Sequence, residues 1–322
     1  MKTQLLYLLT RTPLHVGAGE AVSAVDQPVM RERPTGFPVI PGAAIKGAFA
    51  DLWTDRESGQ RLPEGAWLFG LPSSGDTSAG ALQFSEARLL AFPVRSAKGN
   101  FAWITCPLML RRLARDRGIA AGLLPAREWR DDQALFGRTS AVSLVYGQEA
   151  KVVLEDYTFS HAGELPPGDA TTARSSDGRP AASAEGAATL AGCFQALISR
   201  DPVWSEVGQR LVMVSDGMMS FFGQSACEIQ QRVTVNDVRG AAEAGAFFTQ
   251  ENVPSETLFY ASLNGFEERT RLRPKEQRLE ALRVFADRVA GRVVQLGGDA
   301  SIGHGLCTVE IRETLSLVRR NL

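Results

Sequence analysis

The sequence lacks the features that mark membrane, secreted and zinc-binding proteins. Its 322 residues contain no apolar run long enough to span a bilayer, and the opening MKTQLLYLLTRTP has no small-residue cleavage site. Cysteine is scarce and scattered, without the CxxC spacing of a zinc site or the density of a disulfide framework. The four cysteines are Cys106, Cys193, Cys227 and Cys307. We therefore expect a cytoplasmic protein with buried free thiols and no membrane contact.

An excess of charge of one sign is also missing. The 35 basic and 36 acidic residues give a formal net charge of −1, so nothing global attracts nucleic acid or an anionic membrane. Any attraction to phosphate must be local. With 44% hydrophobic residues, the chain can bury a substantial core.

Standard enzyme signatures are absent as well. The sequence has no GxxxxGK[ST], HExxH or GxSxG motif, so hydrolysis of nucleotides by a P-loop, zinc proteolysis and serine hydrolysis lack support. The stretch HVGAGE at 15–20 looks at first like a dinucleotide-binding loop. Its third glycine position is occupied by Val22, however, and no acidic ribose ligand follows at the expected distance.

The order of predicted strands and helices indicates an α+β fold. Short apolar runs predict strands and helical spacing predicts helices. Strands are expected at 3–11, 81–92, 258–265 and 307–311, a strand passing into a basic helix over 101–116, and helices at 42–54 and from Pro274 to Gly297. This order matches a modified ferredoxin-like, or RRM-like, palm with large insertions better than a doubly wound parallel sheet. We expect one domain over 1–322.

Two insertions stand out. Residues 163–192 are dense in Gly, Pro, Ala and Ser and predict a flexible surface insertion. The stretch RVTVNDVRGAAEAGAFFTQENVP, at 232–254, alternates, breaks and resumes, which predicts a protruding hairpin over 232–251.

Two stretches suggest a binding site for a polyanion. In VSAVDQPVMRERPTGFPVIPGAAIKGAF, at 22–49, the lone acid Asp26 precedes Arg31 and Arg33, and a helix start at Gly42 offers free amides with Lys46 one turn in. Each part also has an ordinary interpretation. Asp26 could form a turn, the arginines could lie on a solvated strand edge, and the helix could simply be capped.

The second stretch is GGDASIGHG at 297–305, which we expect to follow a helix directly. Glycines let backbone amides approach a phosphate, although a helix cap joined to a tight turn explains the same letters. The candidate contacts are Gly297, Gly298, Ser301, Gly303, His304 and Gly305. His15 could likewise be a satisfied turn histidine.

Together, PLHVGAGE, AVDQPVMRERPTGFPVIPGAAIKGAF, WLFG and QLGGDASIGHGL resemble the RAMP superfamily of CRISPR-associated proteins. More narrowly, the chain resembles the backbone subunit of the type III-B (Cmr) effector complex. The four motifs stand in the family's order. The resemblance covers most of the chain apart from the low-complexity insertion.

The resemblance implies copies of an RRM-like palm that stack along a CRISPR RNA, together with other Cmr subunits, and hold the guide for pairing with target RNA. It implies that target cleavage depends on Asp26, with His15 and Glu251 near the same site. The hairpin at 232–251 resembles the family's thumb, which wedges between paired bases. The glycine-rich loop and the helix start with Lys46 match surfaces that grip the guide backbone.

One departure from the family pattern concerns this helix start, because Ala43 and Ala44 stand where serines are usual. Backbone amides and Lys46 must then hold the phosphate. At the cleavage site we expect Asp26 to hold Mg²⁺ or Mn²⁺ and the substrate's own 2′-hydroxyl to act as nucleophile. Two alternatives remain: an RNA-binding filament without cleavage, and a metal-free processing ribonuclease using His15 and His304.

Overall fold

The computed structural model describes residues 2–19, 25–71, 79–117, 129–166, 189–198, 200–236, 241–266 and 280–313. Most of the predicted insertion at 163–192, together with Pro274, lies outside these ranges. The helices are α1 (Gly42–Asp51), α2 (Pro63–Phe69), α3 (Pro107–Arg117), α4 (Leu190–Gln195), α5 (Val207–Arg210), α6 (Asp216–Ser225) and α7 (Ala281–Val289). No described helix is long and apolar enough to cross a membrane.

Thirteen of the described strands form one mixed sheet. Its order is β14-β15-β1-β13-β4-β5-β10-β6-β9-β8-β7, with β2 beside β4 and β3 beside β13. The bounds are β1 (Lys2–Thr10), β2 (Val39–Ile40), β3 (Leu82–Phe84), β4 (Ala87–Arg95), β5 (Phe101–Thr105), β6 (Gln133–Phe136), β7 (Leu144–Tyr146), β8 (Glu149–Leu154), β9 (Tyr157–Gly163), β10 (Leu211–Met213), β13 (Leu258–Gly265), β14 (Val293–Gln295) and β15 (Leu306–Glu313).

The central strands β15, β1, β13 and β4 are antiparallel neighbours. In the chain, α1 lies between β1 and β4, and α7 lies between β13 and β15. The two helices pack against each other, since the rings of Phe49 and Phe285 are 5.0 Å apart. Residues 196–198 contact β1 and β15 as well. Helices and loops enclose β1. Its residues from Leu5 to Leu9 are accordingly a continuous apolar run, and all of them are fully buried.

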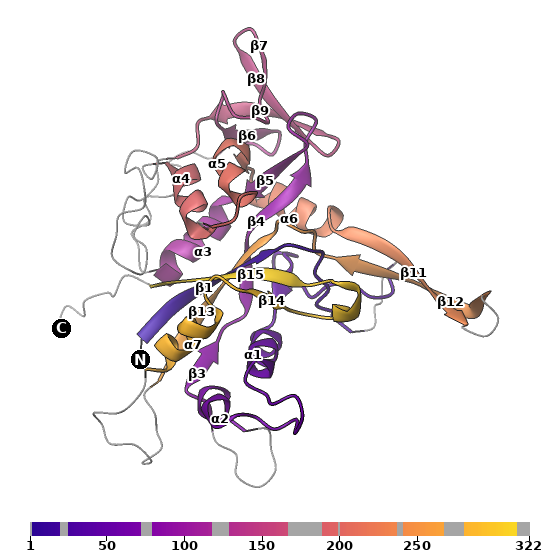
Figure 1. The fold of residues 1–322 in the computed structure, drawn as a ribbon. Coiled ribbons are helices and arrows are strands. Elements are labelled where there is room, and N and C mark those ends of the chain that lie inside the picture. The colour runs from indigo at the N-terminus through magenta and orange to yellow at the C-terminus, as the bar shows by residue number, and fades with distance from the viewer. Residues whose placement is uncertain are drawn as a thin grey trace, which may run out of the picture.

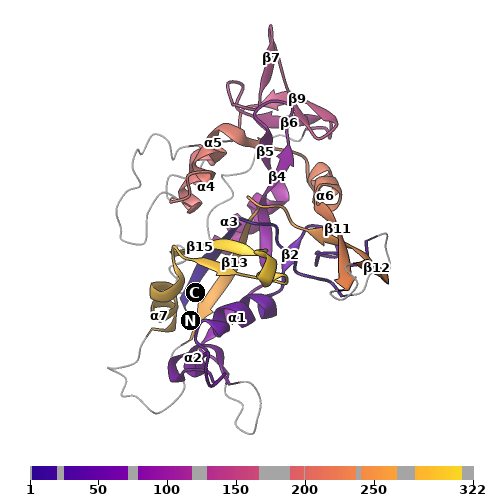
Figure 2. The same cartoon turned by 45° about the vertical axis from the view of Figure 1, so that its right-hand side comes forward.

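The molecule is elongated, with α2 at one end and the hairpin of β7 and β8 at the other (Figures 1 and 2). Toward this second end the sheet becomes mixed, because β10 runs parallel to β5 and β6 runs parallel to β9. The rings of Trp103 and Trp204 pack edge to face at 5.2 Å in this region. One core therefore runs through both halves of the sheet.

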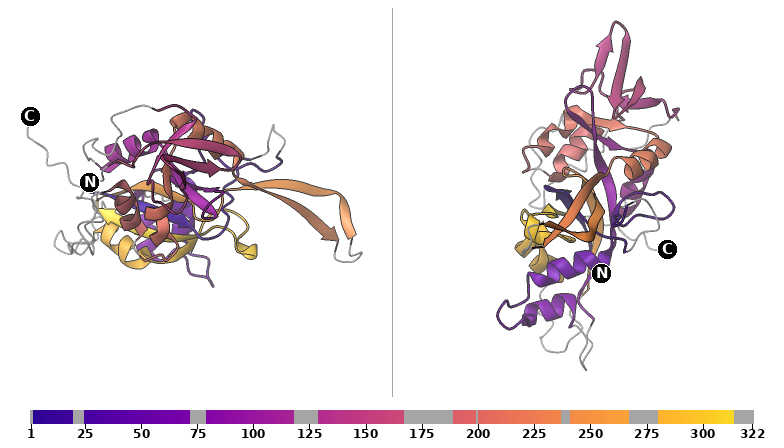
Figure 3. Two further views of the ribbon diagram at one scale, coloured as in Figure 1. Left: turned by 90° about the horizontal axis from the view of Figure 1, so that it is seen from above. Right: turned by 90° about the vertical axis from the view of Figure 1, so that its right-hand side faces the viewer.

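A second, two-stranded sheet projects from the side of the molecule (Figures 1 and 3). It consists of β11 (Glu228–Asn236) and β12 (Ala241–Asn252), paired antiparallel with a register shift between Val233 and Val235. The hairpin predicted at 232–251 is present. It begins four residues earlier, directly after α6.

Two sequence-based predictions were wrong near the C-terminus. The helix predicted to end at Gly297 ends at Val289, and Val293 belongs to β14. Gly291, with φ +72°, turns the chain after the helix, and Val293 then pairs with Thr308 of β15. The loop at 297–305 therefore joins two strands and does not follow a helix. In another part of the chain, the single strand predicted at 81–92 is also wrong, because the structure has two strands there, β3 and β4.

Candidate functional site

Segments from distant parts of the sequence meet at the base of the projecting hairpin. The loop after β1 runs beside the end of β12, where Gln27 N–H donates to Thr249 O at 3.0 Å and Glu251 N–H donates to Gln27 O at 2.9 Å. Further along, Leu14 N–H donates to Val253 O at 2.8 Å. These backbone bonds add the loop to the hairpin as a short extra strand and fix its side chains.

Asp26 lies on this added strand with its side chain exposed. Its Oδ2 accepts hydrogen bonds from Thr249 N at 2.7 Å and from Thr249 Oγ1 at 2.9 Å. These two bonds, the backbone bond first, lower the pKa of Asp26 below its usual range. In the described part of the chain, no hydrogen bond to Oδ1 is found. Asp26 is therefore an oriented carboxylate, ionised at neutral pH, with one oxygen open to a ligand.

Glu251, two residues beyond Thr249, has a different environment. Its side chain is buried, Oε2 accepts from Val29 N at 3.0 Å, and Oε1 pairs with Arg31. Arg31 also donates to Gly36 O at 2.9 Å. The predicted catalytic Glu251 and the predicted RNA-binding Arg31 thus bind each other inside the protein. This geometry favours a positioning role for both, because the pair holds the strand that carries Asp26.

His15 is also buried at this junction. Its Nδ1 lies 2.7 Å from Glu251 O, so Nδ1 carries the proton and Nε2 is the acceptor in the neutral ring. Gly17 is close to Nε2, since a Cβ there would lie 3.0 Å from that atom. The backbone oxygen of His15 accepts from Gly298 N at 2.9 Å. His15 therefore ties the loop after β1 both to β12 and to the glycine-rich loop.

The glycine-rich loop needs glycine for packing at two positions. Gly297 and Gly305 have φ of +74° and +75°, and a Cβ on either would overlap backbone, at 2.2 Å from His15 O and 1.9 Å from Leu296 O. Gly303, with φ +81°, has open space around it, and Ser301 is exposed. The loop is thus a tightly held turn whose outer part remains accessible.

The second face of the hairpin base carries another aspartate, Asp299 of this loop. It accepts from Gln250 Nε2 at 2.6 Å and pairs with Arg232 Nη1 at 2.9 Å. Burial alone would raise the pKa of Asp299, but the bonds from Gln250 and Arg232 outweigh it and lower the pKa. Arg232 Nη2 also lies 3.4 Å from His304 Nδ1. The predicted contact His304 therefore takes part in a latch between loop and hairpin.

The start of α1 is the other predicted site for an anion. Pro41 precedes the helix, no side chain caps it, and its first turn contains no acid. Lys46 is exposed, and so is Arg33 on the preceding loop. Gly42 is needed for packing, since a Cβ there would lie 2.6 Å from Phe84 O. The helix start therefore offers free amides and one lysine to an anion.

The chemistry of Asp26 fits the expected divalent ion. Mg²⁺ and Mn²⁺ prefer hard oxygen ligands, and Mg²⁺ is commonly held by one or two carboxylates with waters and substrate phosphate. Across the described residues, no group of three or more His, Cys, Asp or Glu side chains forms a metal cluster. The described side chains would therefore supply a single carboxylate, from Asp26.

Sequence reasoning missed the residues that orient this site. Thr249, Gln250 and Arg232 carry no motif, and their contacts join positions far apart in the chain. The one available signal was the period of two along β12. This period turns Thr249 and Glu251 to one face and Gln250 to the other.

Comparison with known proteins gives a consistent result. The curated Cmr endoribonuclease Cmr4 of Pyrococcus furiosus is 27% identical over 316 residues, which cover 97% of each chain. The crystal structure of oligomeric Cmr4 from Pyrococcus furiosus matches with a TM-score of 0.62 at 22% identity, over 98% of this chain and 99% of that one. A chain of the type III-B Cmr-beta complex bound to cognate target RNA matches with a TM-score of 0.64 at 16% identity, over 97% of each chain.

These structures share the α+β architecture and the large mixed sheet described above. The model of the RAMP superfamily itself matches residues 7–308, from β1 to β15, and so includes both faces of the hairpin base. The chain therefore belongs to the RAMP superfamily of CRISPR-associated proteins.

Proposed function

We propose that this chain is the backbone subunit of a type III-B CRISPR effector complex and cleaves target RNA paired with its guide. The observation that carries the proposal is the exposed, oriented carboxylate of Asp26, in a chain similar over its whole length to a Cmr endoribonuclease. Copies of the chain would stack along the CRISPR RNA together with other subunits. One Asp26 per copy would then give cuts at regular intervals.

The strand order supports a ferredoxin-like palm as the RNA platform. In that fold the order is fourth, first, third, second, with helices as the two crossovers. Here β15, β1, β13 and β4 occupy these places, and α1 and α7 form the crossovers. The remaining strands and the projecting hairpin are insertions into this unit.

The hairpin supports a role as a thumb because the face next to Asp26 carries three exposed apolar side chains. Ile229, Val233 and Phe247 are 59%, 42% and 71% exposed. Cross-strand pairing puts Val233 opposite Phe247 and Ile229 opposite Glu251, so all three lie on the face of Thr249. An exposed aromatic ring of this kind can stack on an unpaired base whatever its sequence.

The cleavage reaction requires few groups from the protein. Cleavage by the RNA's own 2′-hydroxyl needs the attacking oxygen, the phosphorus and the leaving oxygen in line. Asp26, fixed by Thr249, lies beside the hairpin face on which a displaced base would rest. When bound, Mg²⁺ or Mn²⁺ would supply charge stabilisation at the phosphate. The Arg31–Glu251 pair and His15 keep the Asp26 strand in register with the hairpin.

The test is to incubate the assembled complex with labelled complementary RNA, with and without EDTA. We expect regularly spaced products that disappear with the chelator and return when Mg²⁺ or Mn²⁺ is restored. Cutting that persists in EDTA would favour a metal-free reaction by His15 and His304. RNA binding without any cutting would leave the chain as a filament subunit only.

A further inference from the structure

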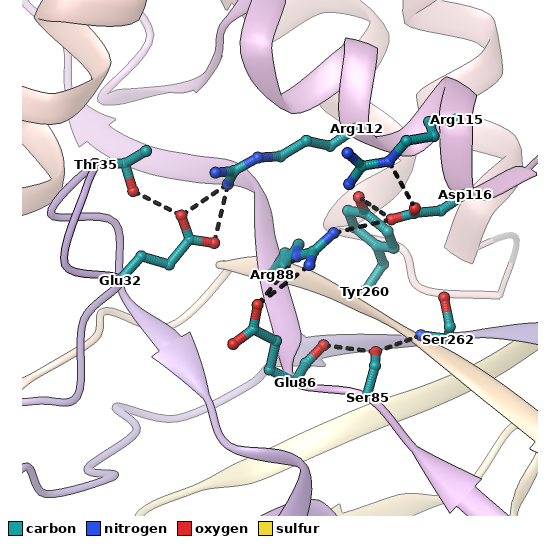
Figure 4. A network of polar contacts seen from close by, with 10 residues as sticks. All are labelled: Glu32, Thr35, Ser85, Glu86, Arg88, Arg112, Arg115, Asp116, Tyr260 and Ser262. Atoms are coloured by element: carbon teal, nitrogen blue, oxygen red, sulfur yellow. Dashed lines mark hydrogen bonds and ion pairs between the residues drawn. The ribbon is translucent and has the colours of Figure 1, made fainter.

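A cavity of about 520 Å³ lies beside the hairpin base, with Arg31 among its lining residues. It lies between the loop that carries Arg33, the start of β4 and the second half of α3. Figure 4 shows five of its polar lining residues, namely Glu32, Glu86, Arg88, Arg112 and Arg115. Five arginines and two glutamates are among its lining residues, although the whole chain has a net charge of −1. They are Arg31, Arg33, Arg88, Arg112, Arg115, Glu32 and Glu86.

Carboxylates hold most of these arginines in place. Arg112 Nη1 donates to both oxygens of Glu32, and Arg88 contacts Glu86 at 3.2 Å (Figure 4). Arg115 Nε donates to the neighbouring Asp116 at 3.3 Å. The terminal nitrogens of Arg115 have no such bond in the described part of the chain. Preorganised guanidinium groups with remaining donors suit the two oxygens of a phosphodiester.

Two features leave a positive excess at the cavity. Arg33 is exposed, and within the described ranges its side chain has no ion pair or hydrogen bond. Pro41 lines the cavity as well, so the uncapped, acid-free start of α1 opens toward it. The positive end of the helix therefore adds to the charge of Arg33. Met30, Pro34 and Val39 supply apolar lining that can contact a ribose.

We propose that this cavity binds the sugar-phosphate backbone of single-stranded RNA and extends the anion-binding surface at the start of α1. The volume lies in the range of pockets that hold small ligands, which is enough for a nucleotide unit of the strand. Arg33 and Arg115 bind phosphate, while Arg88 and Arg112 hold the walls. This inference rests on the proposed function, because it assumes that the chain holds RNA.

The test compares Arg33→Ala combined with Arg115→Ala against a matched control. Arg115 has an exposed side-chain fraction of 67%, and removing it leaves Asp116 with Arg88 and Tyr260 as partners. Arg95 is 68% exposed, also pairs with an acid, and lies at the far end of β4, about 23 Å from Arg88 along the strand. Arg95→Ala therefore removes one exposed arginine charge away from the cavity and is the control for the charge lost in each single substitution, Arg33→Ala and Arg115→Ala, which are measured beside the double variant.

Binding of two unrelated single-stranded RNAs should be titrated over a salt series with the full chain. We expect the double variant to weaken both RNAs alike and to flatten the slope of log affinity against log salt by about 1.4, or about 0.7 per lost contact. Arg95→Ala should leave the slope unchanged. A loss of affinity for only one of the two RNAs would overturn the proposal. So would an unchanged slope of log affinity against log salt.

Three outcomes distinguish failure of this proposal from failure of the proposed function. If Lys46→Ala flattens the slope and the double variant does not, the chain binds RNA but the cavity does not. If the unaltered chain binds neither RNA, both proposals fail. A double variant that binds RNA normally but no longer self-associates, as judged by sedimentation, would make the cavity an interface between copies and overturn the assignment to RNA.

Discussion

The two faces of the hairpin base use the same chemical group for opposite purposes. On one face Asp26 is exposed and receives hydrogen bonds only from Thr249, with no cation paired to it in the described part of the chain. On the other face Asp299 is held by Arg232 and Gln250. Both pKa values are lowered, but only Asp26 keeps an oxygen for a ligand. A shifted pKa alone therefore does not distinguish the two carboxylates, whereas the identity of their partners shows which one keeps an oxygen free to accept a ligand.

The largest expected effect comes from Asp26→Asn. The substitution keeps the shape and removes the charge, so target cutting should fall about 100-fold or more while guide and target binding persist. Single-turnover cleavage and RNA affinity should be measured on the same complex. The control is Asp51→Asn, an exposed acid at the end of α1, which should cut normally. Cutting at the unaltered rate by the Asp26 variant would remove Asp26 from the reaction.

Asp299→Asn should have the opposite effects: it should lower the stability of the protein and leave target cutting largely intact. Asparagine tolerates the φ of +62° at this position but loses the ion pair with Arg232, so the free energy of unfolding should fall by about 1–2 kcal/mol. Because the pKa is lowered in the folded state, this contribution is present above the usual pKa of the group and is lost as pH falls through the lowered value.

Denaturant unfolding of Asp299→Asn, Arg232→Ala and the double variant gives the coupling directly. Cutting by the assembled Asp299→Asn complex should fall less than tenfold, as expected of a latch. Additive losses of stability would show that Arg232 and Asp299 do not support each other. Loss of cutting as deep as that of Asp26→Asn would end the distinction between the two faces.

Local pattern predicted much of the fold. The apolar run at 3–11 became β1, the Pro-Gly step at 41–42 became the start of α1, and the broken alternation after Arg232 became the hairpin. These features depend on residues a few positions apart. The prediction of the end of α7 was wrong for a related reason. Val293 continues the helical spacing, but it is held in β14 by pairing with Thr308 of β15.

The candidate site was predictable only in part. An isolated acid at 26 in a neutral stretch was visible in the sequence. The Arg31–Glu251 pair joins residues 220 positions apart, and the bonds between Asp26 and Thr249 join residues 223 positions apart. No local pattern encodes such contacts. The sequence therefore predicted which groups could react, while tertiary pairing decided which of them stay free.

A smaller effect is expected from Thr249→Val, which sharpens the role of the Asp26 partner. Valine has the shape of threonine and keeps the backbone donor, so only the two bonds of Oγ1 are lost, one donated to Asp26 Oδ2 and one accepted from Asp26 N. Since the bonds from Thr249 lower the pKa of Asp26, that pKa should rise toward its usual range of about 3.9. Cutting at pH 7 should change little, and cutting below about pH 5 should fall more than in the unaltered protein. If the acid side of the pH profile of cutting is the same in both proteins, Thr249 does not set the charge of Asp26.

The smallest effect concerns Glu256, a carboxyl group whose environment favours the neutral, protonated form. Burial, with repulsion from Asp201, raises the pKa of Glu256 to about 7, although Arg11 opposes the shift. An unfolded glutamate titrates near about 4.3, so the unfolded chain loses this proton first as pH rises. The folded state is therefore penalised progressively between about pH 4 and pH 7, and the penalty is then constant.

Glu256→Gln should remove this penalty, raising the free energy of unfolding at pH 8 by about 1–2 kcal/mol after allowance for partial exposure, with little change at pH 4. Denaturant unfolding at both pH values measures the difference, and Glu57→Gln, at an exposed glutamate, is the control. Equal effects at the two pH values would mean that the environment of Glu256 does not favour its neutral form. A gain confined to pH 8 would complete a series of three carboxylates, in which hydrogen bonds leave Asp26 ionised and open, an ion pair holds Asp299, and burial with repulsion from Asp201 favours the neutral form of Glu256.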